Sequence, residues 1–218
     1  MKLPKSILLT IIYLICTEVI GLWIFLIPEE EQYLNVFEAS HLVNTIIALI
    51  VIILFFKFTK RSDVLIFNKT ENKCYIFSIL LGIGFVFFQR PLNLLYYGKI
   101  STTFFNCKLT LDNLASFTAI ASILVVPIIE ELFFRKYIQG GLSENYKPYK
   151  SIIFASLLFA FIHIPFISLF YNFMNFSFHK SYIALFGGIV SGILYYKSKS
   201  IVPSITFHIF WNLTSYIV

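Results

Sequence analysis

The sequence is poor in charge, since only 13% of its 218 residues are Asp, Glu, Lys or Arg. A soluble domain carries about 25% of such residues. The chain is also 58% hydrophobic, with a mean hydropathy of +0.83. It therefore lacks the polar surface that a soluble globular protein needs, and the composition predicts that a lipid bilayer is its solvent.

Cysteine is equally scarce. Cys16, Cys74 and Cys107 are scattered along the chain and form no CxxC pair. This pattern excludes a thiolate metal site of the usual spacing and a disulfide framework. We predict that Cys16 and Cys74 are core thiols and that Cys107 is a free extracytoplasmic thiol.

Acidic residues are outnumbered by basic ones, and the formal net charge is +6. The lysines lie between apolar runs, and no basic stripe with interleaved aromatic residues lies outside those runs. We therefore predict no nucleic-acid partner. The basic residues are expected to contact anionic lipid headgroups instead.

Long apolar runs make up most of the sequence. A membrane span needs about 20 mostly apolar residues, so each run of that length is a candidate span. The first run, from Ser6 to Ile27, is too long for the apolar core of a signal peptide, so we predict a retained span. An eighth short span over 166–179 is left open. The predicted fold is an all-α, multi-pass membrane bundle forming a single domain over 1–218, with seven spans near 6–28, 41–58, 75–97, 113–138, 150–169, 182–197 and 201–218.

The loops predict the orientation. Residues 29–38 hold four Glu and no Lys or Arg, whereas 57–73, 136–150 and 197–199 are rich in Lys and Arg. Because such an excess marks cytoplasmic loops, we predict a cytoplasmic N-terminus. Lys99, Lys108 and Lys180 fall in outer loops against this rule. Abundant Phe, Ile, Lys and Asn suggest an AT-rich bacterial genome and hence the plasma membrane.

The informative residues are ionisable groups within apolar helices, each of which costs about 2.5–3.5 kcal/mol at the bilayer centre. The fourth run contains VVPIIEELFFRKY. Glu131 and Arg135 are four residues apart on a helix, so they are predicted to pair. Glu130 points about 100° away and needs a different partner. Two carboxylates in two environments can take separate roles.

Two more pairs of residues recur at the same spacing, each with a histidine. Phe159 and His163 lie in the fifth run, and His208 and Asn212 lie in the seventh. Counted from the predicted helix ends at 1.5 Å per residue, all these motifs fall within one layer in the cytoplasmic half of the bilayer. We therefore predict that they form one joint site.

A Glu and two His in a dry bundle suit water activation. A carboxylate can take a proton from water as general base, and His and Asn can donate hydrogen bonds to an oxyanion. No Ser or Cys is paired with the histidines, which argues against a covalent nucleophile. Glu130, His163 and His208 could also ligate one divalent metal such as zinc, and the sequence leaves that alternative open.

The three motifs, EELFFR (130–135), FAFIH (159–163) and HIFWN (208–212), resemble those of the CAAX protease and bacteriocin-processing family, known as CPBP or Abi. The resemblance covers roughly 110–218, the predicted catalytic core. It implies intramembrane endoproteolysis of a membrane-associated peptide or lipidated protein, as in type II CAAX prenyl endopeptidases. The family has been described both as metalloprotease and as glutamate-dependent.

The resemblance also implies roles for individual residues. Glu130 would be the general base, His163 would orient the water, and His208 and Asn212 would stabilise the oxyanion. Glu131 belongs to the same catalytic group and, like Arg135 and Phe159, would act in support of it. A non-catalytic peptide-binding or bacteriocin-immunity protein on the same scaffold is the main alternative, and a transporter or proton relay is a third hypothesis.

The remaining unusual residues are given ordinary roles. His41 is predicted to be interfacial and His179 to lie in a loop beside Lys180, and Glu18 is predicted to face the bundle with no partner that the sequence names. Gly188, Ser191 and Gly192, within GGIVSG, are predicted to serve close helix packing alone.

Overall fold

Seven long helical segments make up the fold in a computed structural model that describes residues 1–22, 35–99, 114–166 and 177–218. No β-strand occurs in these ranges. The segments follow the predicted spans in order, so the all-α membrane bundle is confirmed. Their bounds are α1 Leu3–Gly21, α2 Asn35–Phe58, α3 Asn72–Tyr97, a continuous helix Phe117–Ser143, α8 Pro148–Ile162, α10 His179–Ser198 and α11 Val202–Ile217.

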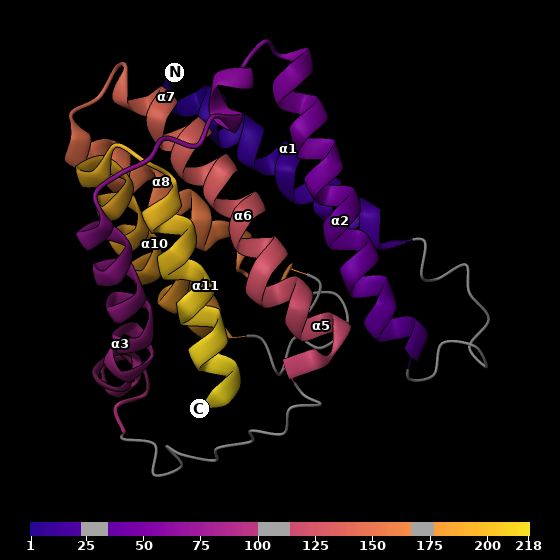
Figure 1. Cartoon of the computed structure of the whole chain (residues 1–218), viewed down its shortest axis with the longest axis vertical. Coiled ribbons are helices and arrows are strands. Elements are labelled where there is room, and N and C mark those ends of the chain that lie inside the picture. The colour runs from indigo at the N-terminus through magenta and orange to yellow at the C-terminus, as the bar shows by residue number, and fades with distance from the viewer. Residues whose placement is uncertain (23–34, 100–113, 167–176) are drawn as a thin grey trace.

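Four of these segments are long and apolar enough, by length and composition, to cross a membrane. They are α1, residues Ala39–Phe58 of α2, α3 and the helix Phe117–Ser143, which we call the central helix. In Figure 1 the central helix runs through the middle of the molecule. The α1–α2 pair lies on one side of it, and α10, α11 and α3 lie on the other.

The central helix is not uniform. It consists of α5 (Phe117–Ile120), η4 (Ala121–Val125), α6 (Val126–Glu131), η5 (Leu132–Gln139) and α7 (Gly140–Ser143), and both η segments are π-helical. Pro127, which has no N–H, lies next to the junction of η4 and α6, where regular α-helical bonding is interrupted. The sequence predicted a helical span here and gave no signal for the π-helical turns. Single turns of π-helix are frequent at functional sites.

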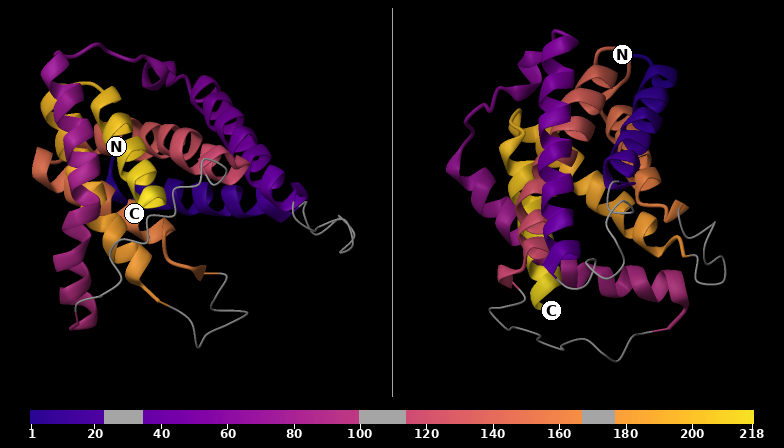
Figure 2. Two further views of the ribbon diagram at one scale, coloured as in Figure 1. Left: turned by 60° about the horizontal axis from the view of Figure 1, so that its bottom comes forward. Right: turned by 90° about the vertical axis from the view of Figure 1, so that its right-hand side faces the viewer.

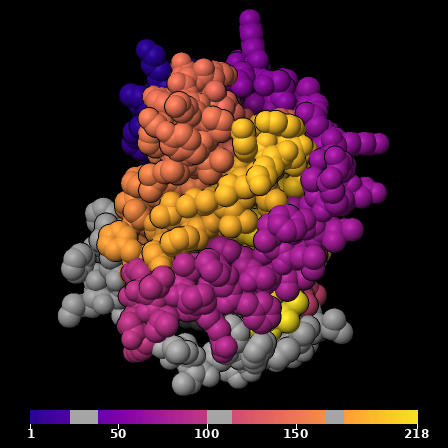
Figure 3. Space-filling view, turned by 90° about the vertical axis from the view of Figure 1, so that its left-hand side faces the viewer, coloured from indigo at the N-terminus to yellow at the C-terminus, as the bar shows by residue number. Residues whose placement is uncertain are grey.

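The outer helices close the bundle around the central helix. α8 packs against η5 and α10, while α3 packs against α11 and α10. Figure 2 shows the α1–α2 pair and α3 on opposite sides of the molecule, and Figure 3 shows α3 lying along α10 on the face that it covers. Glu130 and Glu131 of α6, Ser156 of α8 and His208 of α11 are thereby buried.

Gly82 allows α3 and α11 to approach closely. A Cβ atom at Gly82 would lie 2.6 Å from the Phe207 carbonyl oxygen and 3.0 Å from the Trp211 nitrogen, both backbone atoms. Gly84, two residues along the same helix, has nothing within 4 Å of the corresponding position.

We therefore expect Gly82→Ala to lower the thermal unfolding temperature in detergent. Gly84→Ala is the matched control and should leave it unchanged or raise it, since Ala favours a helix by about 1 kcal/mol over Gly. Equal melting temperatures for the two variants would contradict the close approach of α3 and α11.

The N-terminus and the basic loops meet at one end of the bundle. The Met1 amine lies 2.7 Å from the Glu144 carboxylate, and this ammonium lowers the pKa of the Glu144 carboxyl. The Lys136 amine donates to the Ile66 carbonyl, and the Thr70 hydroxyl donates to the Ser198 carbonyl at 3.3 Å. The N-terminus and the three basic loops, which the charge pattern predicted to share one side of the membrane, therefore lie together at one end of the bundle.

Several boundaries and exposures differ from the sequence predictions. α8 ends at Ile162, not near 169, because Pro165 disfavours helical geometry at the residue before it. The first span is helical to Gly21, and residues 23–28 lie outside the described ranges, as do 167–176 of the proposed eighth span.

Cys16 is exposed and Cys74 is partly exposed, so neither is the core thiol that was predicted. An apolar thiol in a membrane helix can face lipid, and burial inside the protein is not required of it. Cys107 lies outside the described residues.

Candidate active site

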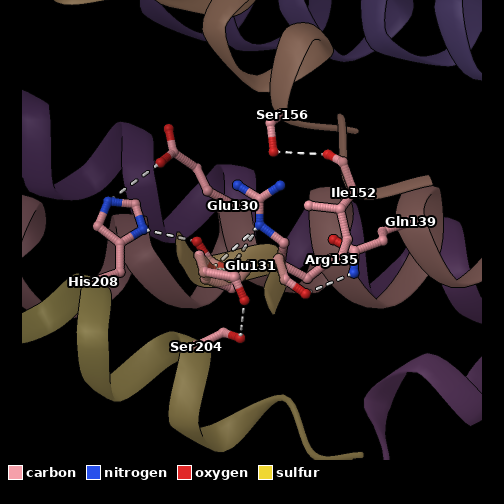
Figure 4. Close-up of polar contacts among 10 residues, drawn as sticks. Glu130, Glu131, Arg135, Gln139, Ile152, Ser156, Ser204 and His208 are labelled. Atoms are coloured by element: carbon pink, nitrogen blue, oxygen red, sulfur yellow. Dashed lines mark hydrogen bonds and ion pairs between the residues drawn. The ribbon is translucent and has the colours of Figure 1, made fainter. Parts of the chain in front are cut away.

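Glu131 is the centre of a buried polar cluster between the central helix, α10 and α11 (Figure 4). Its side chain is 1% exposed. One carboxylate oxygen accepts from the Nε of Arg135 at 3.2 Å and from the Ser191 hydroxyl, and the other lies 3.0 Å from Nδ1 of His208. The predicted Glu131–Arg135 pair is therefore confirmed, and each carboxylate oxygen has a partner.

Arg135 is enclosed completely, with a side-chain exposure of 0%. Its guanidinium carbon lies 4.9 Å above the centre of the Phe159 ring, a cation–π contact. Nη1 and Nη2 have no hydrogen-bond partner. Glu131 is thus the anion that neutralises a cation with no access to solvent.

The small residues of α10 serve this cluster as well as packing. A Cβ at Gly188 would lie 3.2 Å from Nη2 of Arg135, and Ser191 donates to Glu131. Gln139 donates to the Gly192 carbonyl at 2.9 Å. The prediction that GGIVSG acts through helix packing alone is therefore wrong, because its hydroxyl and its missing side chains shape the environment of the ion pair.

His208 lies between the two carboxylates. Nδ1 faces Glu131, and Nε2 lies 3.8 Å from Oε2 of Glu130. A carboxylate can only accept, so the hydrogen bond to Glu131 places a proton on Nδ1. The Trp211 ring stacks on the imidazole at 5.2 Å between centroids, and Phe159 meets it edge-on at 5.9 Å. These contacts hold the ring in one orientation.

Glu130 is the carboxylate left without a cation of its own. The residue is 8% exposed, and its Oε2 is buried with no hydrogen-bond partner. It lines a cavity of about 730 Å³ together with His163, His208 and Asn212. A buried carboxylate oxygen without a partner is costly unless water or a ligand satisfies it. Its position in the cavity wall makes it available to such a group.

His163 reaches the cavity from the end of α8. It is the C-cap residue of that helix, and its Nδ1 lies 2.8 Å from the Phe159 carbonyl oxygen. A carbonyl only accepts, so Nδ1 donates and Nε2 remains as the second hydrogen-bonding atom of the ring. The Phe159 ring packs against the imidazole at 4.6 Å. Phe159 thus contacts both histidines and the guanidinium.

Asn212 follows His208 by one turn of α11. Its amide donates to the backbone carbonyl of Ser122 at 2.8 Å, which ties α11 to η4. The side chain still lines the cavity, and its second amide hydrogen is not used by this bond. The structure therefore brings Glu130, His163, His208 and Asn212 to one cavity wall.

Other cavity residues were not identified from the sequence. Gln89 of α3, and His179 and Lys180 at the start of α10, also line the cavity. The Nε2 atom of His179 lies 2.6 Å from the Asn93 side-chain oxygen. His179 is therefore part of the cavity wall, and as the first residue of α10 it does not lie in the predicted loop. Its loop-like surroundings in the sequence offered no periodic signal that could have placed it there.

The proposed metal ligands were tested by their arrangement. Over the described ranges, no three or more His, Cys, Asp and Glu side chains converge in a way that could hold a metal ion. Glu130, His163 and His208 share a cavity, but Glu130 and His208 face each other at 3.8 Å as an acid and an imidazole.

Comparison with known families supports the motif assignment. Residues 112–214 match the family described as type II CAAX prenyl endopeptidase Rce1-like. This range contains all three motifs. No curated protein and no solved structure matches the chain significantly.

Proposed function

From the match of residues 112–214 to the type II CAAX prenyl endopeptidase Rce1-like family, we propose that the chain is an intramembrane endopeptidase of the CAAX protease and bacteriocin-processing family. Its substrate would be a membrane-associated peptide or lipidated protein. The observation that carries the proposal is the buried, unpartnered Oε2 of Glu130 in a cavity wall that also holds His163, His208 and Asn212.

In this mechanism Glu130 acts as general base on a water molecule that His163 helps to orient. Glu130 takes one proton, and the water oxygen attacks the carbonyl carbon of the scissile peptide bond. The resulting tetrahedral intermediate carries a negative charge on the former carbonyl oxygen. Glu130 then returns its proton to the leaving nitrogen as the C–N bond breaks, which yields a new carboxylic acid and a new amine.

His208 and Asn212 are the proposed donors to the oxyanion. Asn212 has an amide hydrogen beyond the one given to Ser122, and His208 can donate from Nε2 when both ring nitrogens are protonated. Glu131 holds His208 by Nδ1 and is itself held by Arg135 and Ser191. Glu131 is thus a positioning residue for His208, while Glu130 contacts the reacting atoms.

The proposed setting is the bacterial plasma membrane. The end of the bundle that gathers the N-terminus and the basic loops would face the cytoplasm, in keeping with the excess of Lys and Arg there. Lipid headgroups would contact these loops, and nucleic acid is not a proposed partner.

The test of the proposed function is a cleavage assay. The purified protein in detergent is incubated with a library of membrane-associated and prenylated peptides, and new termini are identified by mass spectrometry. We expect endoproteolytic products whose formation requires His163 and His208. A protein that binds peptides without cutting any of them would instead support the peptide-binding or immunity alternative.

Removing metal ions with chelators distinguishes water activation by the Glu130 carboxylate from water activation by a bound metal ion. We expect 1,10-phenanthroline and EDTA to leave the cleavage rate unchanged within about twofold, because Glu130 alone would activate the water. Metal analysis of the same preparation is the accompanying measurement. A rate that falls on chelation and returns with added zinc would replace the glutamate mechanism by a metal-assisted one and would leave the protease assignment intact.

A further inference from the structure

A second cavity lies on the other side of Glu130. It has a volume of about 280 Å³ and lies between α1, α2 and α6. Its wall is polar for a membrane bundle, with Thr17, Glu18, His41, Asn44 and Thr45 among the lining residues. The sequence placed Glu18 facing the bundle and His41 at the interface. Both line this cavity, and Glu18 is exposed.

Glu130 belongs to both cavities. Val126 and Glu130 line the 730 Å³ cavity and the 280 Å³ cavity alike. On α8, Ile162 lines the smaller cavity and the next residue, His163, lines the larger. The proposed general base therefore stands in the wall between two compartments, and its Oε2 has no hydrogen-bond partner.

A polar connection crosses the same wall through Ser122. Nε2 of His41 lies 3.4 Å from the Ser122 hydroxyl, and Asn212 donates to the Ser122 carbonyl. His41 lines the smaller cavity, while Ser122 and Asn212 line the larger. The two cavities thus adjoin along η4 and α6, where Val126 and Glu130 line both.

Hydrolysis consumes one water molecule per bond, and the substrate itself displaces water from the cavity that it enters. The surrounding helices are apolar, so replacement water cannot come through them. A water molecule occupies about 30 Å³ in the liquid and needs two to four polar partners when buried. The smaller cavity offers room for several molecules, and its Thr, Asn, His and Glu side chains can bond them.

We propose that the cavity between α1 and α2 is a water compartment that delivers the hydrolytic water to Glu130 from the side opposite the substrate. The delivery role rests on the proposed protease function. The presence of water in the compartment does not depend on it.

Thiol labelling tests for water in the compartment. Cys16, Cys74 and Cys107 are first replaced by Ala, and Thr45→Cys is compared with Ile46→Cys in liposomes. Thr45 lines the cavity, whereas Ile46, one residue along α2, is 43% exposed on the outer surface of the protein, where lipid would lie. The reagent is 2-aminoethyl methanethiosulfonate, whose disulfide exchange proceeds through the thiolate and so requires water.

We expect Thr45→Cys to react at least about tenfold faster than Ile46→Cys, since a thiol in lipid stays protonated. Equal rates would overturn the water compartment whether or not the protein cleaves peptides. Thr17→Cys offers an independent position on α1 if Thr45→Cys does not fold.

Cleavage after labelling tests the delivery role. The adduct at Thr45→Cys should lower kcat about tenfold or more with little change in KM, because the substrate cavity is left open. The adduct at Ile46→Cys should have no effect. Labelling at Thr45→Cys with unchanged kcat would overturn delivery, whereas absence of cleavage in the unlabelled protein would count against the protease function alone.

Discussion

Replacing Glu130 by Gln is expected to lower kcat/KM for peptide cleavage by about 10²–10⁴-fold, the contribution typical of a general base. Gln keeps the volume of the side chain, so the wall between the two cavities should persist. It cannot accept the proton of the attacking water, because an amide has no basic oxygen at neutral pH. Steady-state cleavage with the folded, purified variant measures the effect.

The matched control for this change is Glu144→Gln. Glu144 is a carboxylate of the same chain that pairs with the Met1 amine at the basic end and lies in neither cavity. Its substitution should leave kcat/KM unchanged. Full activity of Glu130→Gln would remove the general base from the mechanism, and a biological phenotype retained by that variant would favour the non-catalytic alternative.

Glu131→Ala should destabilise the fold by about 3–5 kcal/mol, the cost of leaving one charge of a buried pair without its partner. The charge in question is the Arg135 guanidinium, which is 0% exposed and has no acceptor on Nη1 or Nη2. Loss of the carboxylate would also free Nδ1 of His208 and the Ser191 hydroxyl. Thermal unfolding in detergent, followed by circular dichroism, measures the change.

The double variant Glu131→Leu with Arg135→Leu separates folding from catalysis. Replacing both charges by apolar groups of similar size is often neutral or stabilising, so the melting temperature should recover relative to Glu131→Ala. Cleavage should remain low, since His208 would still lack the acceptor that orients it. A double variant that unfolds as readily as Glu131→Ala, or one that regains full activity, would contradict this division of roles.

Glu130 and Glu131 show which contacts can be predicted from the spacing of residues along one helix. Their separation around the helix predicted that only Glu131 would meet Arg135, and the structure agrees. The same spacing could not predict that His208 would lie between them, at 3.0 Å from one and 3.8 Å from the other. That arrangement depends on how α11 packs against α6, a contact between segments about 77 residues apart along the chain.

Other features escaped prediction for the same reason. Ser191 seemed a packing residue because small residues recur in GGIVSG, yet it donates to Glu131 from 60 residues away. The π-helical turns on either side of α6 are a matter of backbone hydrogen bonding within the central helix, and hydropathy has no signal for them. The sequence could not predict that Glu18 and His41 line a cavity together with Glu130, because these residues come from three different helices.

Hydropathy and spacing alone determined that the chain is a helical membrane protein, roughly where the seven long helical segments of the described residues lie, and which polar residues are out of place. These are local properties, since transfer from water to lipid acts on each segment and helical periodicity acts within a few turns. Tertiary structure decided which carboxylate is neutralised, which is left facing a cavity, and that two cavities meet at Glu130. These outcomes depend on distances between helices, and such distances follow from packing, which no single segment encodes.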